Sequence, residues 1–170
     1  MTAPASVLKR FARDRSGLAA IELAIIAPVL FLCTLCVADL GRFALDKTWV
    51  TGAASAGAEY AAAHADDTKY TPTYPMGSDF SAAITTAATS ATPTTNISVS
   101  PTPSTYYGCA TSTGVTASNQ GATCPSGTST GGLVGEYVSV TATMPFTALF
   151  SAAGISYPST ITSTAVVRIQ

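Results

Sequence analysis

The longest apolar stretch of the chain lies near its N-terminus, in residues 18–38. These 21 residues include one charged side chain, Glu22. A helix of that length spans about 30 Å, the hydrocarbon thickness of a bilayer. A buried core helix fits less well, because such helices are amphipathic and shorter. The pattern therefore predicts a transmembrane helix over residues 18–40, in which Pro28 is tolerated because membrane helices accommodate proline.

A second helical pattern covers residues 42–65, where the helix either continues or resumes after Gly41. The segment is rich in alanine, the best helix former. Spacings of three and four place one stripe on a face of this helix, formed by Trp49, Ala53, Ala56, Tyr60 and Ala63. The small side chains in and beside the stripe allow close packing. They predict packing on the protein's own sheet, on another subunit, or on both.

The rest of the chain predicts a short helix and strands. Residues 79–90 have a helical pattern with Ser78 as the cap and Phe80, Ile84 and Ala87 or Ala88 facing inward. Alternating apolar and polar residues predict three strands, near residues 96–100, 136–146 and 160–169. Residues 100–133, rich in Ser, Thr, Gly and Pro, predict a long loop. Another short helix is expected within residues 147–154.

Together these elements predict an α+β fold. An N-terminal transmembrane helix continues into a second helix, which packs on a small antiparallel β-sheet. Three strands with one polar face are about the minimum for a stable sheet covered by a helix.

Charge is sparse and unevenly distributed. Charged residues make up 10% of the chain, against about 25% in an average soluble domain. The net charge of −1 predicts no broad basic surface for nucleic acid. Residues 1–17 carry a basic cluster, whereas the rest of the chain has a net charge of −4; the cluster consists of Lys9, Arg10, Arg13 and Arg15. The positive-inside rule places this end in the cytoplasm and residues 41–170 outside.

Two other kinds of export signal fit the same segment less well. A cleaved signal peptide usually has an apolar run of 7 to 15 residues, and "CVAD" at 36–39 is only a passable cleavage site. A lipoprotein signal fits less well, because bulky leucines directly precede Cys33 and Cys36. Inside a membrane helix these two cysteines are interpreted as small apolar residues, because a redox pair needs a polar setting that lowers the thiol pKa.

Glu22 is the residue that a plain membrane anchor does not explain. A carboxylate at the bilayer centre costs about 3 kcal/mol on insertion scales. One explanation is that Glu22, one turn from the cytoplasmic edge, reaches back to the headgroups. The other requires a cut after Gly17, which would give Leu18 a free α-amine. Leu18 and Glu22 are then i and i+4 on one helix face, and the carboxylate can pair with that amine or with a neighbouring subunit's.

At these residues the sequence resembles a known family. A basic leader that ends in glycine, an apolar helix directly after it, and a glutamate at position five of the mature chain are the pattern of type IV prepilins. The stretch "SGLAAIELAIIAPVLF", followed by "DLGRFALDK", is most similar to the TadE-like pseudopilins of the tight-adherence (Tad/Flp) pilus system. The resemblance covers roughly residues 9–65. Because the major Flp pilins are much shorter than this chain, it implies a minor pseudopilin.

The resemblance implies a pilin-like fold and a specific processing step. A prepilin peptidase of the bacterial inner membrane is expected to cut between Gly17 and Leu18, leaving residues 1–17 as a cytoplasmic leader. Residues 41–170 are then expected to form a periplasmic pilin-like domain. The chain is expected to act in pilus assembly and adhesion, and its helix either stays in the inner membrane or enters the pilus. The implied partners are the peptidase, other Tad pseudopilins, inner-membrane assembly proteins and the lipid bilayer.

Two further cysteines lie in the loop predicted over residues 100–133. Outside the cytoplasm the compartment is oxidising, so Cys109 and Cys124 are expected to form a disulfide. A metal site is the alternative, but two sulfurs without histidine or carboxylates nearby make a poor one.

Catalytic patterns are weak throughout the chain. The one histidine, His64, precedes two aspartates, but no serine lies in a nucleophile motif. A surface histidine near a helix C-terminus explains it better. We therefore expect no enzyme, no cofactor and no metal. Two hypotheses remain: a TadE-like pseudopilin cut after Gly17, and an uncleaved membrane-anchored periplasmic binding module whose Ser/Thr-rich loop binds a ligand or a surface.

Overall fold

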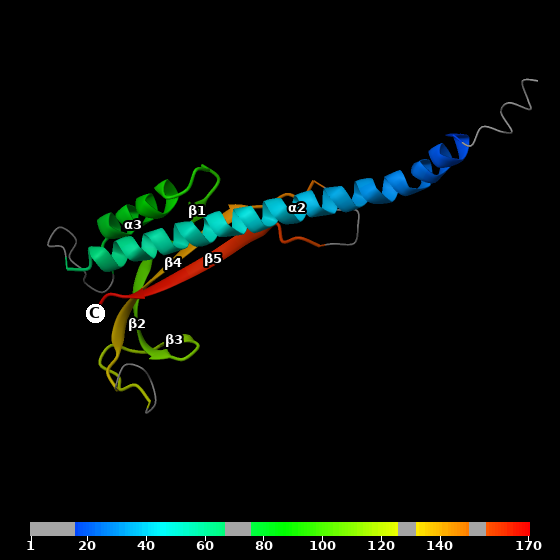
Figure 1. The fold of residues 1–170 in the computed structure, drawn as a ribbon. Coiled ribbons are helices and arrows are strands. Elements are labelled where there is room, and N and C mark those ends of the chain that lie inside the picture. The colour runs from blue at the N-terminus through cyan, green and yellow to red at the C-terminus, as the bar shows by residue number, and fades with distance from the viewer. Residues whose placement is uncertain (1–15, 67–75, 126–131, 150–155) are drawn as a thin grey trace, which may run out of the picture. The chain divides into compact units, whose positions relative to one another are not determined.

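A computed structural model describes residues 16–66, 76–125, 132–149 and 156–170 (Figure 1). In chain order its elements are α2 (Ser16–Ala63), α3 (Ser78–Ser90), β1 (Ser98–Val99), β2 (Ser104–Thr111), β3 (Gly114–Ala117), β4 (Gly135–Pro145) and β5 (Thr160–Arg168). The chain divides into two compact units, residues 1–41 with 148–156, and residues 42–147 with 157–170. Most of the expected leader and most of the helix expected within 147–154 lie outside the described residues.

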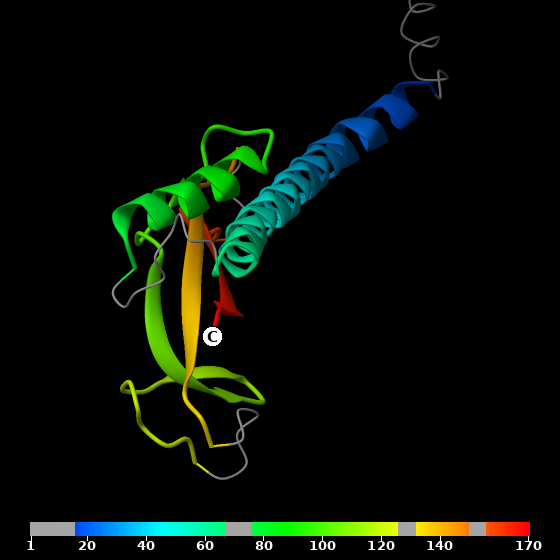
Figure 2. The same cartoon turned by 90° about the vertical axis from the view of Figure 1, so that its left-hand side faces the viewer.

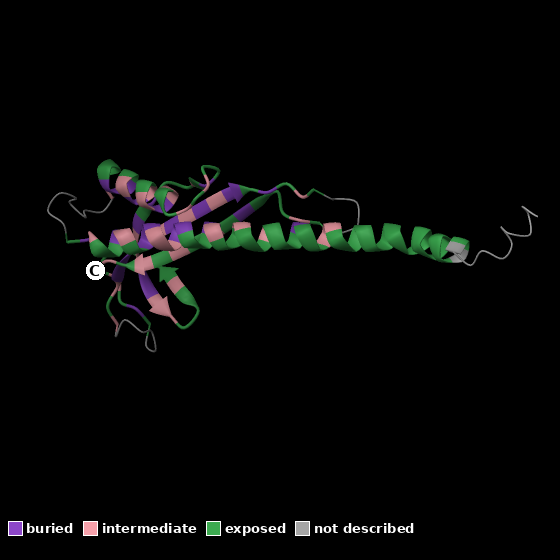
Figure 3. Ribbon diagram, turned by 45° about the horizontal axis from the view of Figure 1, so that its top comes forward, coloured by how far each residue is buried: buried purple, intermediate pink, exposed green. Residues whose placement is uncertain are grey.

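Helix α2 is one uninterrupted helix of 48 residues. It passes through Pro28 and Gly41 without a break, so the two helical patterns in the sequence form a single element. In the first unit nearly all of its described side chains are exposed, and in the second unit one face becomes buried (Figure 3). The change follows the composition, because bulky apolar residues dominate the first part and alanine and glycine the second.

The sheet is antiparallel and is built around β4, the longest strand with 11 residues. β5 pairs with β4 over residues 137–145, with Val140 opposite Ala165. β1 and β2 both pair with the edge of β4 that β5 leaves open, and they lie one after the other along it. Val99 of β1 is opposite Ala142, and Ser104 of β2 is opposite Ser139. β3 pairs with the outer edge of β2 (Figures 1 and 2). The α+β fold expected from the sequence is confirmed.

The core of the second unit lies between the two helices and β4. Its fully packed cluster consists of Ala58 and Ala61 from α2, Phe80, Ile84 and Ala88 from α3, and Val138 and Val140 from β4. The even-numbered residues of β4 that were predicted to share one face, from Val138 to Met144, are all buried. Alternation in β4 thus sets which face of the sheet the helices cover.

The buried stripe of α2 differs from the predicted one. Its buried members are Val50, Ala53, Ala54, Gly57, Ala58 and Ala61. Of the predicted stripe, Ala53 is buried, Trp49 and Tyr60 are half-buried and Ala63 is exposed. The buried face is shifted around the axis of α2 by about one residue position from the predicted face. This shift arises because alanine and glycine let the backbone approach the sheet more closely than the large aromatic side chains do.

The predicted cap of the short helix is also wrong. Gly77 occupies the N-cap position of α3, and no side chain caps it. Ser78 is instead the first helical residue, and its hydroxyl donates to Asp79 Oδ1 at 3.4 Å. The inward residues were predicted correctly, since Phe80, Ile84 and Ala88 are all buried.

Residues 100–133 are not simply a loop, which corrects the prediction for this segment. They contain β2 and β3, which form a hairpin around Ser112 and Thr113. Thr111 Oγ1 donates to the carbonyl oxygen of Gly114 at 2.9 Å and ties the two ends of this turn together. The sheet therefore has five strands instead of three, and β1 is limited to Ser98–Val99.

Candidate functional site

The expected processing segment lies at the start of α2. The helix begins at Ser16, so the Gly17–Leu18 peptide bond lies in its first turn. Gly17 is exposed, and a Cβ added there would meet no atom within 4 Å. Nothing in the described fold therefore requires glycine at this position. Any such requirement must come from another molecule that approaches the backbone.

Glu22 is exposed on the same helix, four residues after Leu18. The helical geometry places the backbone nitrogen of residue 18 and the side chain of residue 22 on one face. No hydrogen bond or ion pair joins Glu22 to another residue in the described part of the chain. The arrangement is compatible with pairing to a new α-amine, in the same chain or in a neighbouring one.

Around Glu22 the helix presents a large apolar surface. Seven side chains are between 52% and 69% exposed: Ile21, Leu23, Ile25, Ile26, Val29, Leu30 and Phe31. The most apolar part of α2 has a mean hydropathy of 2.5, and none of it is buried against the chain. By length and composition this helix is able to cross a membrane. A surface of this kind is stable in lipid or against other apolar helices.

A second acidic residue, Asp39, lies at the other end of the apolar run. Its side chain is 1% exposed, and its Oδ1 accepts a hydrogen bond from the Leu149 backbone N–H at 2.9 Å. Both residues belong to the first unit. The sequence did not single out Asp39, because the partner is 110 residues away in the chain.

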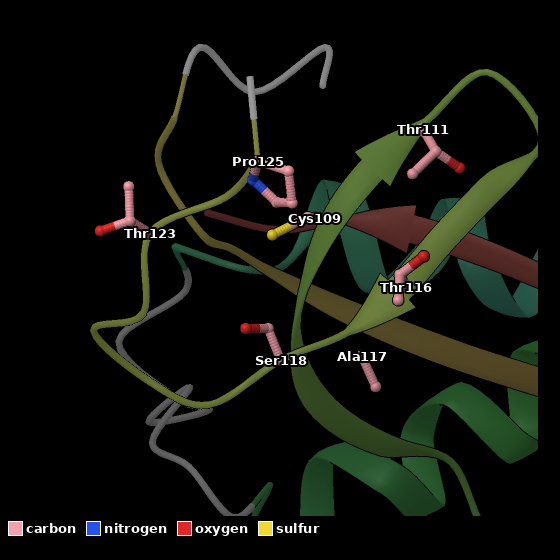
Figure 4. Close-up of a pocket in the computed structure, with 7 residues that line it drawn as sticks. All are labelled: Cys109, Thr111, Thr116, Ala117, Ser118, Thr123 and Pro125. Atoms are coloured by element: carbon pink, nitrogen blue, oxygen red, sulfur yellow. The ribbon is translucent and has the colours of Figure 1, made fainter. Parts of the chain in front are cut away.

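The hairpin of β2 and β3 carries the disulfide. Cys109 in β2 is joined to Cys124, with their Cα atoms 5.6 Å apart, as expected from the two cysteines. Beside this bridge lies a pocket of about 320 Å³, lined by threonine, serine and alanine side chains and by Pro125. Figure 4 shows the hydroxyls of Thr111 and Thr123 pointing away from each other. The pocket's hydroxyls thus do not converge on one point, as catalytic groups would.

One buried carboxyl group was missed in the sequence. Glu136 in β4 is 4% exposed, and its Oε1 has no hydrogen-bond partner in the described residues. It lies opposite Tyr107 of β2. Burial raises the pKa of Glu136. Alternation alone would have placed this glutamate on the inward face with Val138, which is the signal that was available.

The remaining candidates give no active site. His64 is half-buried beyond the end of α2, with its ring stacked on Tyr60 at 4.0 Å and its Nδ1 3.0 Å from the Tyr60 carbonyl oxygen. Cys33 and Cys36 are free thiols on α2. Among the described residues, no three His, Cys, Asp or Glu side chains are grouped to hold a metal ion.

Comparison with known proteins gives one match. Residues 17–59 match the family model described as TadE-like protein, and the match starts at the glycine of the expected cut. No curated protein and no solved structure matches the chain. The match covers the exposed apolar part of α2 together with much of its buried part. Over residues 17–59 the chain is TadE-like, as its sequence predicted.

Proposed function

We propose that the chain is a minor pseudopilin that acts in the assembly of a tight-adherence pilus. A prepilin peptidase cuts it after Gly17, and residues 18–40 anchor it in the bacterial inner membrane. Residues 1–17 face the cytoplasm and residues 41–170 form the periplasmic pilin-like domain. Its partners are other Tad pseudopilins and inner-membrane assembly proteins. The observation that carries the proposal is an exposed apolar helix with one carboxylate, a single turn past the expected cut.

The chemistry of the cut explains why that carboxylate is retained. Hydrolysis of the Gly17–Leu18 bond converts an amide nitrogen into a charged α-amine at the membrane surface. A lone carboxylate in the bilayer costs about 3 kcal/mol on insertion scales. Pairing with the amine offsets this cost for both groups, because two opposite buried charges are tolerated better than either alone. Where Glu22 does not pair with the amine of its own chain, its carboxylate favours the arrival of a subunit that brings one.

The local structure at Gly17 also suits cleavage. Only Ser16 and Gly17 of the helix precede the scissile bond. Glycine weakens a helix by about 1 kcal/mol relative to alanine, so this first turn opens easily for a protease that needs an extended backbone. The open space around Gly17 leaves room for that protease.

The test compares Gly17→Leu with a matched control, Gly41→Leu. Both glycines lie in α2, and at both an added Cβ meets no atom within 4 Å. The two substitutions should therefore affect the fold alike, whereas only the first blocks the peptidase. Intact mass of the protein from its native host should show a chain that begins at Leu18 for the wild type and for Gly41→Leu. Gly17→Leu should retain the leader.

A wild-type chain that begins at Met1 or Thr2 in cells with an active peptidase would refute the processing step.

The pairing of Glu22 with the new amine has its own test. Glu22→Gln should leave the cut in place, because the scissile bond is unchanged, but should reduce the number of pili per cell seen by electron microscopy. Normal piliation in that strain would show that the pairing account is wrong.

A second function is favoured by the pocket beside the disulfide. An uncleaved, membrane-anchored periplasmic module would use this hydroxyl-lined pocket of about 320 Å³ to bind a small neutral ligand. The same mass measurement separates the two proposals, since this module keeps residues 1–17.

A further inference from the structure

The segment that follows β4 is fastened to α2 through a buried side chain. Asp39 is 1% exposed, and its Oδ1 accepts the N–H of Leu149 at 2.9 Å. The bond uses the backbone of Leu149, so its side chain is left outside and is 66% exposed. A buried carboxylate that accepts a main-chain N–H fixes the position of Leu149 beside Asp39, because this hydrogen bond is lost if Leu149 moves away.

Two aromatic residues that flank residues 147–156 pack on α2 one turn after Asp39. Phe146 and Tyr157, which lie on either side of residues 147–156, both pack on Phe43, with ring centroids 5.4 Å and 5.8 Å away. Phe43 follows Asp39 by four residues, so the two side chains leave α2 on one face. The hydrogen bond to Asp39 itself holds Leu149 at the height of Asp39 along the helix.

That height coincides with the end of the apolar run. Residues 18–38 contain no charge other than Glu22, and Asp39 is the first charged residue after them. If this run spans the bilayer, as the proposed function requires, Asp39 marks the level at which α2 leaves the hydrocarbon. Its neighbours in the helix are apolar and exposed, with Val37 at 70% and Leu40 at 58%.

We propose that the chain makes a second contact with the membrane at Leu149, which follows β4 and inserts among the lipid headgroups beside the end of α2. Asp39 is the positioning residue that holds it there. A lipid surface is the occupant that fits, because three exposed apolar side chains, Val37, Leu40 and Leu149, lie at or beside the level where the membrane ends. This rests on the membrane-anchoring part of the proposed function and is independent of the pilus role.

The experiment places a single tryptophan at position 149. The chain has one tryptophan, so Trp49→Phe gives a background without any. Leu149→Trp in this background leaves the backbone bond to Asp39 intact. The full chain is reconstituted in vesicles of phosphatidylethanolamine and phosphatidylglycerol whose acyl chains are brominated near the headgroup. We expect the bromines to remove most of the fluorescence that is seen in unbrominated vesicles.

Two substitutions of Asp39 separate positioning from chance insertion. Asp39→Ala removes the acceptor and should restore most of the fluorescence of Trp at position 149. Asp39→Asn keeps an oxygen that accepts the Leu149 N–H and should keep the quenching. Leu133→Trp is the control for the general preference of tryptophan for membrane surfaces, because Leu133 is similarly exposed, at 72%, and belongs to the other unit.

Phe31→Trp in the same background reports on the anchor itself. If this tryptophan is quenched and that at position 149 is not, the anchor stands and the second contact is refuted. If neither is quenched, the anchoring fails together with the inference. Equal quenching at positions 133 and 149 overturns the proposal, because it reflects tryptophan alone. Shielding of position 149 from acrylamide without quenching by bromine also overturns it, and indicates a second copy of the chain as the occupant.

Discussion

Within the second unit, α2 packs tightly on β4 and α3 at Gly57. A Cβ added there would lie 2.9 Å from Val140 Cγ1, 3.1 Å from Ala88 Cβ and 3.4 Å from Ile84 Cγ2. Ordinary carbon contacts are about 3.5–4.0 Å. Gly57→Ala therefore forces α2 away from both β4 and α3, and the packing of the whole cluster has to adjust.

The size of the effect follows from two opposing terms. Replacing glycine by alanine inside a helix stabilises it by about 1 kcal/mol. Inserting a methyl group into a packed core costs about 1–3 kcal/mol. Gly52 provides the control, because it lies in the same helix and a Cβ there meets no atom within 4 Å. Since the helix term is the same for both variants, Gly57→Ala should be less stable than Gly52→Ala by about 1–3 kcal/mol.

The assay is urea unfolding of the full chain in a mild detergent, followed by the fluorescence of Trp49. This half-buried residue lies in α2, two turns before Gly57. We expect Gly52→Ala to raise the midpoint and Gly57→Ala to lower it relative to Gly52→Ala, with unchanged slopes. Equal midpoints for the two variants would show that α2 does not pack on β4 as described, and the predicted order of stabilities would be refuted.

Two more predictions concern the second unit. Because burial raises the pKa of Glu136, the folded chain binds the proton of this carboxyl group more tightly than the unfolded chain does. The free energy of unfolding is therefore highest below the ordinary carboxyl pKa, and it falls as the pH rises towards the raised pKa of the folded chain. Glu136→Gln should remove this dependence and raise the free energy of unfolding at pH 7 by about 1 kcal/mol, measured by urea unfolding across a pH series; an unchanged pH profile would exclude Glu136 as its source. Replacing Cys109 and Cys124 together by alanine should lower the free energy of unfolding by about 3 kcal/mol, because the bridge closes 15 residues. The same urea titration checks it, and a loss below about 1 kcal/mol would show that the hairpin holds without the bridge.

The spacing of apolar residues in the sequence was sufficient to predict the long helix and the two long strands. The apolar run of residues 18–38 and the alanine-rich segment after it lead to α2, and strict alternation leads to β4 and β5. Periodicity could not fix the rotation of α2, because alanine is compatible with either a buried or an exposed position. The contact that decides it, Gly57 on Val140, joins residues far apart in the sequence.

The hairpin of β2 and β3 was hidden for a different reason. Half of the residues in its two strands are Ser, Thr or Gly. Its turn is Ser112–Thr113, without the Asn-Gly or Asp-Gly pair that marks a two-residue hairpin. Gly108 looks like a loop residue, but an added Cβ would meet Val115 Cγ1 at 2.5 Å, so the close pairing of the strands requires it. The two tyrosines of β2 were the available strand signal.

The two carboxylates at the ends of the apolar run have opposite surroundings, and the difference bears on function. Asp39 is buried and bonded to Leu149, a partner supplied by the same chain. Glu22 is exposed and has no such partner in the described residues. An unpaired carboxylate is costly in a bilayer. Burying Glu22 in the hydrocarbon would therefore require a positively charged partner that the described fold does not provide. Under the proposed function, the cut after Gly17 would supply one such partner and an adjacent subunit another. Asp39 is therefore explained by the fold, whereas the fold alone does not explain Glu22, whose carboxylate either reaches back to the headgroups or, as proposed, pairs with an α-amine after the cut.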